Sequence, residues 1–204
     1  MSLLRRWHNA LVHHRRVRVL AEMLAERIPP GSTVLDIGCG DGTIGQLISQ
    51  RKPGLAVQGV ELVPRAGCKI PCGPFDGSSL PFPGDSFDVC LLVDVLHHTT
   101  DVGALLREAA RVSRRFVLLK DHASEGSLDA ATLGLMDWVG NRPHGVGLTY
   151  NYQSRSQWKQ HFAACHLREL SCTFEIPLYP APFSWIVGRK LHFISLLDKM
   201  NPRV

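Results

Sequence analysis

The feature that most constrains the fold is a short apolar run that ends in a cluster of glycines. Residues 33–37 read Thr-Val-Leu-Asp-Ile, and Gly38, Gly40 and Gly42 follow directly. An apolar run without alternation is typical of a strand buried on both faces. Glycines let a chain turn sharply and approach a ligand closely. A helical segment over residues 44–50 comes next, so the sequence predicts a strand, a glycine turn and a helix whose first N–H groups face the turn.

Strand-like and helical segments alternate after this turn. A helix is expected over residues 101–112, with Asp101 as its N-cap. Such alternation predicts an α/β fold, a Rossmann-like doubly wound sheet that is mostly parallel and has helices on both faces. The further strand candidates are residues 55–62, 71–76 (a weaker one), 87–94 and 115–120.

The end of the chain has a different pattern. Residues 157–165 look helical, and residues 170–176 alternate as a half-buried strand does, with Leu170 and Cys172 on the apolar face. A proline-rich link then leads to an apolar run over residues 183–191, which we interpret as one more strand. We therefore expect an antiparallel strand near the C-terminal edge of the sheet.

Length and composition suit one domain. The chain has 204 residues, 45% of them hydrophobic, which is enough for one compact core. No apolar run approaches the roughly 20 residues that cross a bilayer, and the basic N-terminus lacks the apolar core of a secretory signal. We expect a cytoplasmic location and a single domain over residues 1–204. Its expected parts are an N-terminal helical cap (1–30), a cofactor-binding half (31–122), and an acceptor lid with the C-terminal strands (123–204).

The formal net charge of +5 is concentrated at the start of the chain. Five arginines precede the first acidic residue, Glu22. The same segment also carries apolar residues at helical spacing, which indicates an amphipathic helix. This segment has three interpretations: a cap packed over the cofactor site, a basic helix that touches anionic lipid, or a solvated arm. No RNA-binding module is visible, so nucleic acid is not an expected partner.

The six cysteines contain no Cys-x-x-Cys pair. Cys68 and Cys72 are four residues apart, without a second pair or flanking histidines to complete a zinc site. We expect reduced thiols that act as small apolar side chains, and no metal site.

The glycine turn has two ligand interpretations. Glu61 ends the second strand candidate about 20 residues later, where a carboxylate can accept both ribose hydroxyls of a nucleoside. Residues 40–45 also satisfy the G-x-G-x-x-G pattern of nicotinamide dinucleotide sites. However, the predicted strand ends before Gly38, and Asp41 would repel a pyrophosphate from inside the loop. A carboxylate at Asp36 or Asp41 suits a ligand with an ammonium or sulfonium group instead.

Five motifs in order resemble class I S-adenosylmethionine-dependent methyltransferases, in particular the type 11-like group that includes the ubiquinone and menaquinone C-methyltransferases. They fall at residues 36–42, 59–62, 75–82, 87–98 and 106–112, within a span from about Val34 to Asp121 that covers more than a third of the chain. One departure is visible, because Ser113-Arg114-Arg115 replaces the family's usual Pro-Gly-Gly turn before strand five. The resemblance implies S-adenosylmethionine as the cofactor and S-adenosylhomocysteine as the product.

The resemblance also implies which residues meet the cofactor. They lie at the ends of the first four strands of the expected sheet. Their implied contacts are the methionine part for Asp36, Gly38 and Gly40, the ribose for Glu61, the adenine for Leu62, Asp76, Gly77 and Ser78, and the methyl group for Val93 and Asp94.

The acceptor side is less determined. Methyl transfer is an in-line displacement, and it needs a base only when the acceptor must lose a proton. The candidate catalytic residues are His122, after the fifth strand, and Tyr150 and Tyr152, in an aromatic and glycine-rich segment that is either a lid or an ordinary connection. The expected acceptor is a small or lipid-like molecule, and the oligomeric state stays open. The alternative functions are a non-catalytic module that binds the adenosyl cofactor and an NAD-dependent oxidoreductase.

Overall fold

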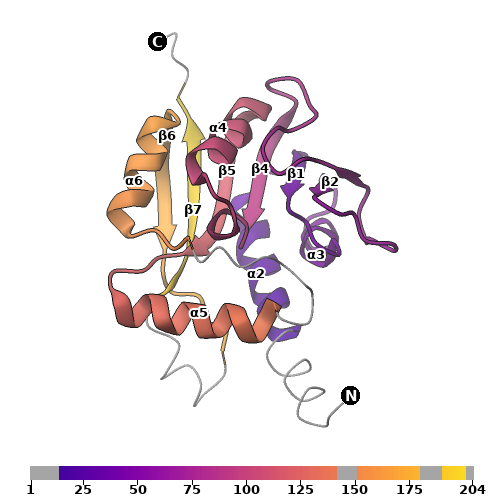
Figure 1. Ribbon diagram of the computed structural model, residues 1–204. Helices are drawn as coiled ribbons and strands as arrows, with labels where there is room; N and C mark the ends of the chain where they lie inside the picture. The colour runs from indigo at the N-terminus through magenta and orange to yellow at the C-terminus, as the bar shows by residue number, and fades with distance from the viewer. Residues whose placement is uncertain (1–13, 142–150, 180–189, 201–204) are drawn as a thin grey trace.

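The computed structural model describes residues 14–141, 151–179 and 190–200, which form one seven-stranded sheet between two helical layers (Figure 1). The strand order is β3-β2-β1-β4-β5-β7-β6. Neighbours from β3 to β5 are parallel, and β7 runs antiparallel to both β5 and β6. The strands are β1 (Thr33–Ile37), β2 (Ala56–Glu61), β3 (Cys72–Pro74), β4 (Phe87–Val93), β5 (Ser113–His122), β6 (Leu167–Thr173) and β7 (His192–Lys199).

This topology confirms the predicted mostly parallel sheet with an antiparallel strand near the C-terminal edge. It also differs from the common dinucleotide-binding order 3-2-1-4-5-6, because β7 lies between β5 and β6. The central strands β4 and β5 are buried along most of their length, as expected for strands covered on both faces.

The helices of the described segments are α2 (His14–Arg27), α3 (Thr43–Arg51), α4 (Val102–Val112), α5 (Ser127–Asn141) and α6 (Arg155–Ala164), together with the short 3₁₀ helix η2 (Leu96–His98). Helices α2 and α3 share one core with the sheet, and α4 and α6 share the other. The prediction of helices on both faces is therefore confirmed. None of the helices in the described segments is both long and apolar enough to span a membrane.

Helix α4 begins where the sequence predicts. The Asp101 carboxylate accepts a hydrogen bond from the Ala104 N–H at 2.9 Å, as an N-cap does. Leu105, Leu106 and Ala109 face the core and are fully or almost fully buried. Their burial fixes α4 against β4 and β5, the two strands whose ends carry much of the candidate site.

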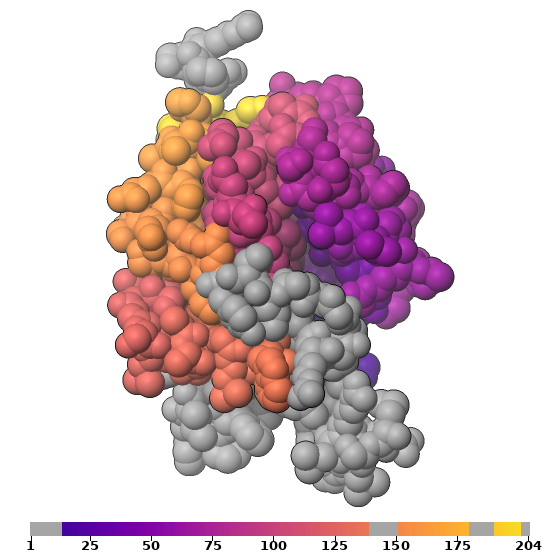
Figure 2. Space-filling view, in the orientation of Figure 1, coloured from indigo at the N-terminus to yellow at the C-terminus, as the bar shows by residue number. Residues whose placement is uncertain are grey.

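Helix α5 was not predicted. It crosses the molecule below the carboxyl ends of β4 and β5 (Figure 1), and in the space-filling view its surface lies directly below that of α6 (Figure 2). The sequence interpretation left residues 137–152 as either a lid or an ordinary connection. The structure puts the first part of that segment in α5, while residues 142–150 lie outside the described residues.

One prediction at the C-terminal edge was wrong. Leu170 and Cys172 are exposed in β6, because a bulge between Glu169 and Ser171 breaks the simple alternation. The last described strand is β7, over residues that were not assigned to a strand. The expected strand over residues 183–191 falls mostly outside the described residues.

Candidate functional site

The glycine loop between β1 and α3 closes tightly on its neighbours at one position and stays open at another. Gly38 has φ 70°, and its N–H and that of Cys39 donate to the Val60 carbonyl at 2.8 and 3.2 Å. A Cβ on Gly38 would lie 2.7 Å from the Val95 side chain, whereas a Cβ on Gly40 (φ 60°) would meet nothing within 4 Å. The strand ends before Gly38, as predicted, and the loop has free space beside Gly40.

Glu61 joins the end of β2 to this loop. Its carboxylate accepts hydrogen bonds from the Gly40 N–H at 2.8 Å and the Leu62 N–H at 2.9 Å. An ionised carboxylate has about four acceptor positions, so further donors can bind to the same group. Leu62 is 57% exposed, and a Cβ on Gly77 would lie 2.9 Å from its side chain. The acidic group and an exposed apolar face thus lie next to each other.

Asp76 follows β3 and faces the same end of the sheet. One of its carboxylate oxygens accepts hydrogen bonds from the Ser79 N–H, the Ser78 N–H and the Ser78 hydroxyl, at 2.7 to 2.9 Å. These bonds lower the pKa of Asp76, so the group is ionised at neutral pH. Folding therefore brings Asp76, Gly77 and Ser78 beside Leu62, as the resemblance implies.

Asp36 is a buried acid on β1. Burial, together with the nearby Glu61 charge, raises the pKa of Asp36 to about 7. A buried acid next to another acid is a favourable place for a cation, because an ammonium group would offset both effects. The carboxylate lies on the α3 side of the strand, where a Cβ on Gly45 would be 3.1 Å from it.

Asp94 leaves β4 with a left-handed backbone (φ 58°), and two cations bind its carboxylate. The donors are the Arg16 guanidinium of α2 and the Lys120 ammonium of β5. Burial alone would raise the pKa of Asp94, but Lys120 and Arg16 hold it well below its usual range. The sequence pointed to Asp94 but grouped Arg16 only with the basic N-terminus. Val93, the preceding residue, packs on the α2 side of the sheet.

A second group of interacting polar side chains, His97 and Asp121, lies beside Asp94 and its two cations. His97 Nδ1 is 2.6 Å from Asp121 Oδ1, and Asp121 also accepts from the Leu96 and His122 N–H groups. Burial lowers the pKa of His97, but Asp121 more than offsets it, so the net shift is upward. The pKa of His122 falls to about 4, because of burial and the Lys120 charge. His122 is therefore neutral at neutral pH, while the raised pKa of His97 favours the protonated ring beside Asp121.

Tyr152 completes the cluster from a distant part of the chain. Its hydroxyl donates to Asp137 of α5, and its ring centroid lies 5.9 Å from that of His97 and 6.0 Å from that of His122. Two of the three predicted catalytic residues, His122 and Tyr152, are thus brought together. The third, Tyr150, lies outside the described residues.

Two further members of this cluster were not among the candidate site residues of the sequence analysis. His192 of β7 lies 3.3 Å from the Lys120 ammonium, and Asp137 lies 3.6 Å from His97 Nε2. Asp137 was visible only as part of the expected lid, and His192 stood outside every predicted strand. We call the group Arg16, Asp94, His97, Lys120, Asp121, His122, Asp137, Tyr152 and His192 the acceptor-side cluster.

Residues 8–168 match the family model of a methyltransferase domain. The chain belongs to this methyltransferase family. The match confirms the resemblance to class I S-adenosylmethionine-dependent methyltransferases, and with it S-adenosylmethionine as the cofactor.

Relatives and solved structures agree with the family. An uncharacterized methyltransferase of Mycobacterium sp. (strain JLS) is 35% identical over 139 residues, 64% of this chain and 50% of the relative. A demethylmenaquinone methyltransferase of Tropheryma whipplei (strain Twist) is 32% identical over 104 residues, 47% of this chain and 42% of the relative. The chain thus spans about half the length of these curated relatives or less. The geranyl diphosphate C-methyltransferase of Streptomyces coelicolor A3(2) has the same fold, with a TM-score of 0.68 at 14% identity, over 92% of this chain and 80% of that one.

Proposed function

We propose that this chain transfers a methyl group from S-adenosylmethionine, by in-line displacement, to a small-molecule acceptor with a lipid-like part. The observation that carries the proposal is the meeting of two unlike surfaces at the carboxyl ends of β1, β4 and β5. On one side lies the open glycine loop with Glu61. On the other side lies the acceptor-side cluster, which includes Asp94 at the end of the neighbouring strand β4.

The cofactor side fits an adenosyl ligand with a charged amino acid part. Glu61 can accept the ribose hydroxyls, Leu62 offers an exposed apolar face to the adenine, and Asp76 with Gly77 and Ser78 can meet the adenine edge. The space beside Gly40 and the buried acid Asp36 suit the methionine part with its ammonium group. Val93 and Asp94 would border the methyl group. The bound cofactor supplies a methyl group on a sulfonium, whose neutral thioether is a good leaving group.

The protein's own contribution is mainly alignment, which can lower a barrier by about 7–11 kcal/mol. His122 is neutral at neutral pH and can accept a hydrogen bond from an acceptor hydroxyl or acidic carbon. Because its pKa is about 4, His122 is a weak base that does not stay protonated at neutral pH. Its role would therefore be to orient the acceptor group by a hydrogen bond. Tyr152, held by Asp137, adds an aromatic wall next to His122. Tyr150, which lies outside the described residues, stays a proposed catalytic residue.

The acceptor class is supported by two kinds of observation. Two of the matched methyltransferases are named for demethylmenaquinone and for geranyl diphosphate. In this chain, Leu128, Leu135 and Trp138 expose apolar surface on α5, below the carboxyl ends of β4 and β5. Peripheral contact with an anionic membrane through the N-terminal helix is a compatible proposal, since Arg15 and Arg18 are exposed on α2.

The first experiment is calorimetric titration with S-adenosylhomocysteine, with NADH as a parallel ligand. Binding of S-adenosylhomocysteine alone is expected, and binding of NADH alone would favour the oxidoreductase. Transfer of isotope-labelled methyl is then measured on hydroquinones and phenols with and without a prenyl chain. His122→Gln and Tyr152→Phe should lower turnover and leave S-adenosylhomocysteine affinity unchanged. Cofactor binding without transfer to any of these acceptors would favour the non-catalytic module.

A further inference from the structure

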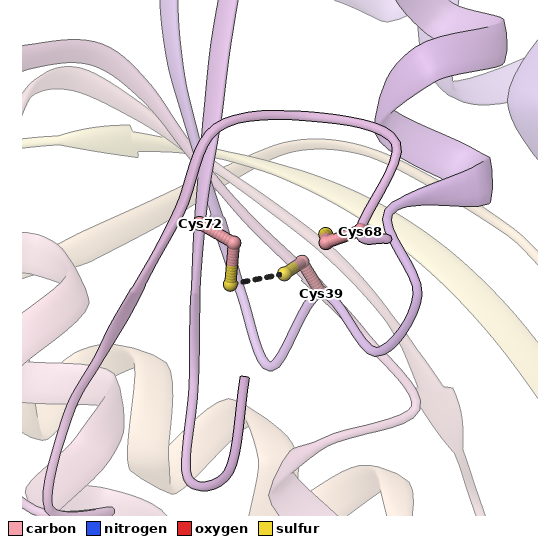
Figure 3. A group of neighbouring side chains, drawn as sticks. All are labelled: Cys39, Cys68 and Cys72. Carbon is pink, nitrogen blue, oxygen red and sulfur yellow. Dashed lines mark hydrogen bonds between the residues drawn. The ribbon is translucent and has the colours of Figure 1, made fainter. Parts of the chain in front are cut away.

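Folding brings a third cysteine against the pair that the sequence spacing shows. Cys39 lies in the glycine loop, Cys68 in the connection between β2 and β3, and Cys72 at the start of β3. Their side chains converge (Figure 3). The three sulfur atoms lie within 4.8 Å of one another, and those of Cys39 and Cys72 are 3.4 Å apart. Sequence spacing alone connects only Cys68 and Cys72, so this cluster is a product of the fold.

Two glycines make room for these thiols. A Cβ on Gly59 of β2 would lie 2.4 Å from the sulfur of Cys39, and a Cβ on Gly42 would lie 2.8 Å from the sulfur of Cys68. Any larger residue at either position would push a sulfur away from the other two. The convergence therefore depends on residues that leave space beneath the loop as well as on the cysteines themselves.

We propose that Cys39, Cys68 and Cys72 form a three-thiolate site for a thiophilic divalent cation of the Zn²⁺ class. Zinc–sulfur bonds of about 2.3 Å in tetrahedral geometry place the sulfurs about 3.8 Å apart, close to the separations in this cluster. Three protein ligands leave the fourth position for water. A redox pair needs only two cysteines, so the third thiol within reach of both others favours a metal.

The uptake step balances simply. Each thiol releases its proton to solvent as its sulfur–metal bond forms, and the divalent cation with three thiolates carries one negative charge. The N-terminus of α3 favours this charge, because Gly42 is its N-cap and lies against Cys68. The Lys69 ammonium is also near, bonded to Thr43. The buried acid Asp36 opposes the charge, as does the carboxylate of Glu61.

The site would tie together the three segments that carry the proposed cofactor contacts. Cys39 lies between Gly38 and Gly40, Cys68 lies in the connection that follows Leu62, and β3 leads from Cys72 to Asp76. A metal that holds these segments in their present positions removes freedom that cofactor binding would otherwise have to remove. This coupling rests on the proposed cofactor site, and it is reciprocal. Zn²⁺ should raise S-adenosylhomocysteine affinity, and S-adenosylhomocysteine should raise Zn²⁺ affinity.

The test is a Cd²⁺ titration of the full chain under a phosphine reductant, followed by the ultraviolet absorption of cadmium–thiolate bonds. One metal per chain and three released protons are expected, with Zn²⁺ displacing Cd²⁺ at the same stoichiometry. Cys68→Ser and Cys72→Ser should each weaken binding by about 100-fold or more, since loss of outer partners alone costs 10–100-fold. Cys172→Ser, which changes an exposed cysteine of β6, is the matched control and should bind as the wild type does.

Several results would overturn the proposal. Metal uptake without thiolate absorption would place the ion elsewhere, for example at Asp94, His97 and His122, which also converge. Equal metal affinity in the wild type and in Cys68→Ser would also place the ion elsewhere. If Cys72→Ser does not fold, the affinity of Cys68→Ser alone decides whether the cysteines bind the metal. If the reduced protein binds no metal and peroxide treatment removes two hydrogens from the chain, two of the cysteines form a disulfide pair instead. These readouts need no cofactor, so they are independent of whether the proposed methyl transfer is correct.

Discussion

The proposed cofactor side and the proposed acceptor side of the carboxyl-end site are built from different kinds of groups. The cofactor side consists of backbone N–H groups, glycines with positive φ, an exposed leucine and two acids that bond to the backbone, all within residues 36–78. The acceptor side consists of buried and half-buried charged and aromatic side chains drawn from Arg16 to His192. The first is a local structure that a short stretch of sequence can encode. The second exists only after distant elements have packed, so its integrity should depend far more on global stability.

The largest expected effect is on the acceptor side. Lys120→Met removes the fully buried partner of Asp94 and should lower the free energy of unfolding by up to about 3–5 kcal/mol, because the Asp94 carboxylate keeps only Arg16 of its two cationic partners. Arg168→Met breaks an exposed ion pair with Asp198 and should cost about 0–1 kcal/mol. Chemical denaturation measures both values. Equal losses would show that the cluster does not contribute to stability as a buried network.

The next effect is on the glycine loop. Gly38→Ala combines a left-handed backbone, which costs about 1–2 kcal/mol, with crowding against Val95, which costs about 1–3 kcal/mol. Gly54→Ala is the matched control, since Gly54 also has a positive φ but its Cβ would meet nothing within 4 Å. Thermal unfolding of both variants separates the backbone cost from the contact. If Gly54→Ala loses as much stability as Gly38→Ala, the contact between Gly38 and Val95 contributes nothing beyond the backbone cost.

A smaller effect should appear in affinity rather than in stability. Glu61→Ala removes the proposed ribose acceptor and should weaken S-adenosylhomocysteine binding. Each lost hydrogen bond should cost at most about 1.5–3 kcal/mol of binding free energy. Calorimetry measures the loss, and Glu22→Ala, on the exposed side of α2, is the control. Because Glu61 also accepts from Gly40, the unfolding free energy should be measured in parallel. A loss of stability without a loss of affinity would give Glu61 a loop-supporting role only.

The contrast between the two sides also explains what the sequence could reveal. The glycine turn follows a short apolar run, and Glu61 and Asp76 fall at the ends of the strands expected over residues 55–62 and 71–76, so these positions could be predicted within a few residues. Asp101 and the buried face of α4 could be predicted because capping and helical spacing are local rules. The parallel order of the central strands followed from the alternation of elements.

The acceptor side could not be predicted in the same way. Arg16 looked like one of five surface arginines, and no local rule says that it turns inward to meet Asp94, 78 positions away. His192 was missed because no strand was predicted over residues 192–199. The convergence of Cys39 with Cys68 and Cys72 likewise depends on the register of β1, β2 and β3. Such contacts depend on tertiary packing, which periodicity and spacing do not encode.

The smallest effect contrasts the two sides by pH. The folded pKa of Asp36 is raised from 3.8 to about 7, so its contribution to stability is complete below pH 3.8 and is lost as pH rises through about 7. The folded pKa of His122 is lowered from 6.5 to about 4, so its contribution is complete above pH 6.5 and is lost as pH falls through about 4. Between these limits the two slopes have opposite sign, and each is at most about 1.4 kcal/mol per pH unit.

Relative to the wild type, Asp36→Asn should therefore make the unfolding free energy rise more steeply between about pH 4 and pH 6.5, because the falling contribution is removed. His122→Gln should make the slope of the unfolding free energy against pH less positive than in the wild type over the same range, because a rising contribution is removed. Denaturant titrations at several pH values measure both differences, and Asp129→Asn, on α5, controls for the loss of an ordinary acid. If both variants shift the slope in the same direction, one of the two groups has the opposite protonation state in the folded protein. The histidine ring protons, followed by NMR, would then show whether His122 is neutral, because a neutral ring keeps its chemical shift down to about pH 4.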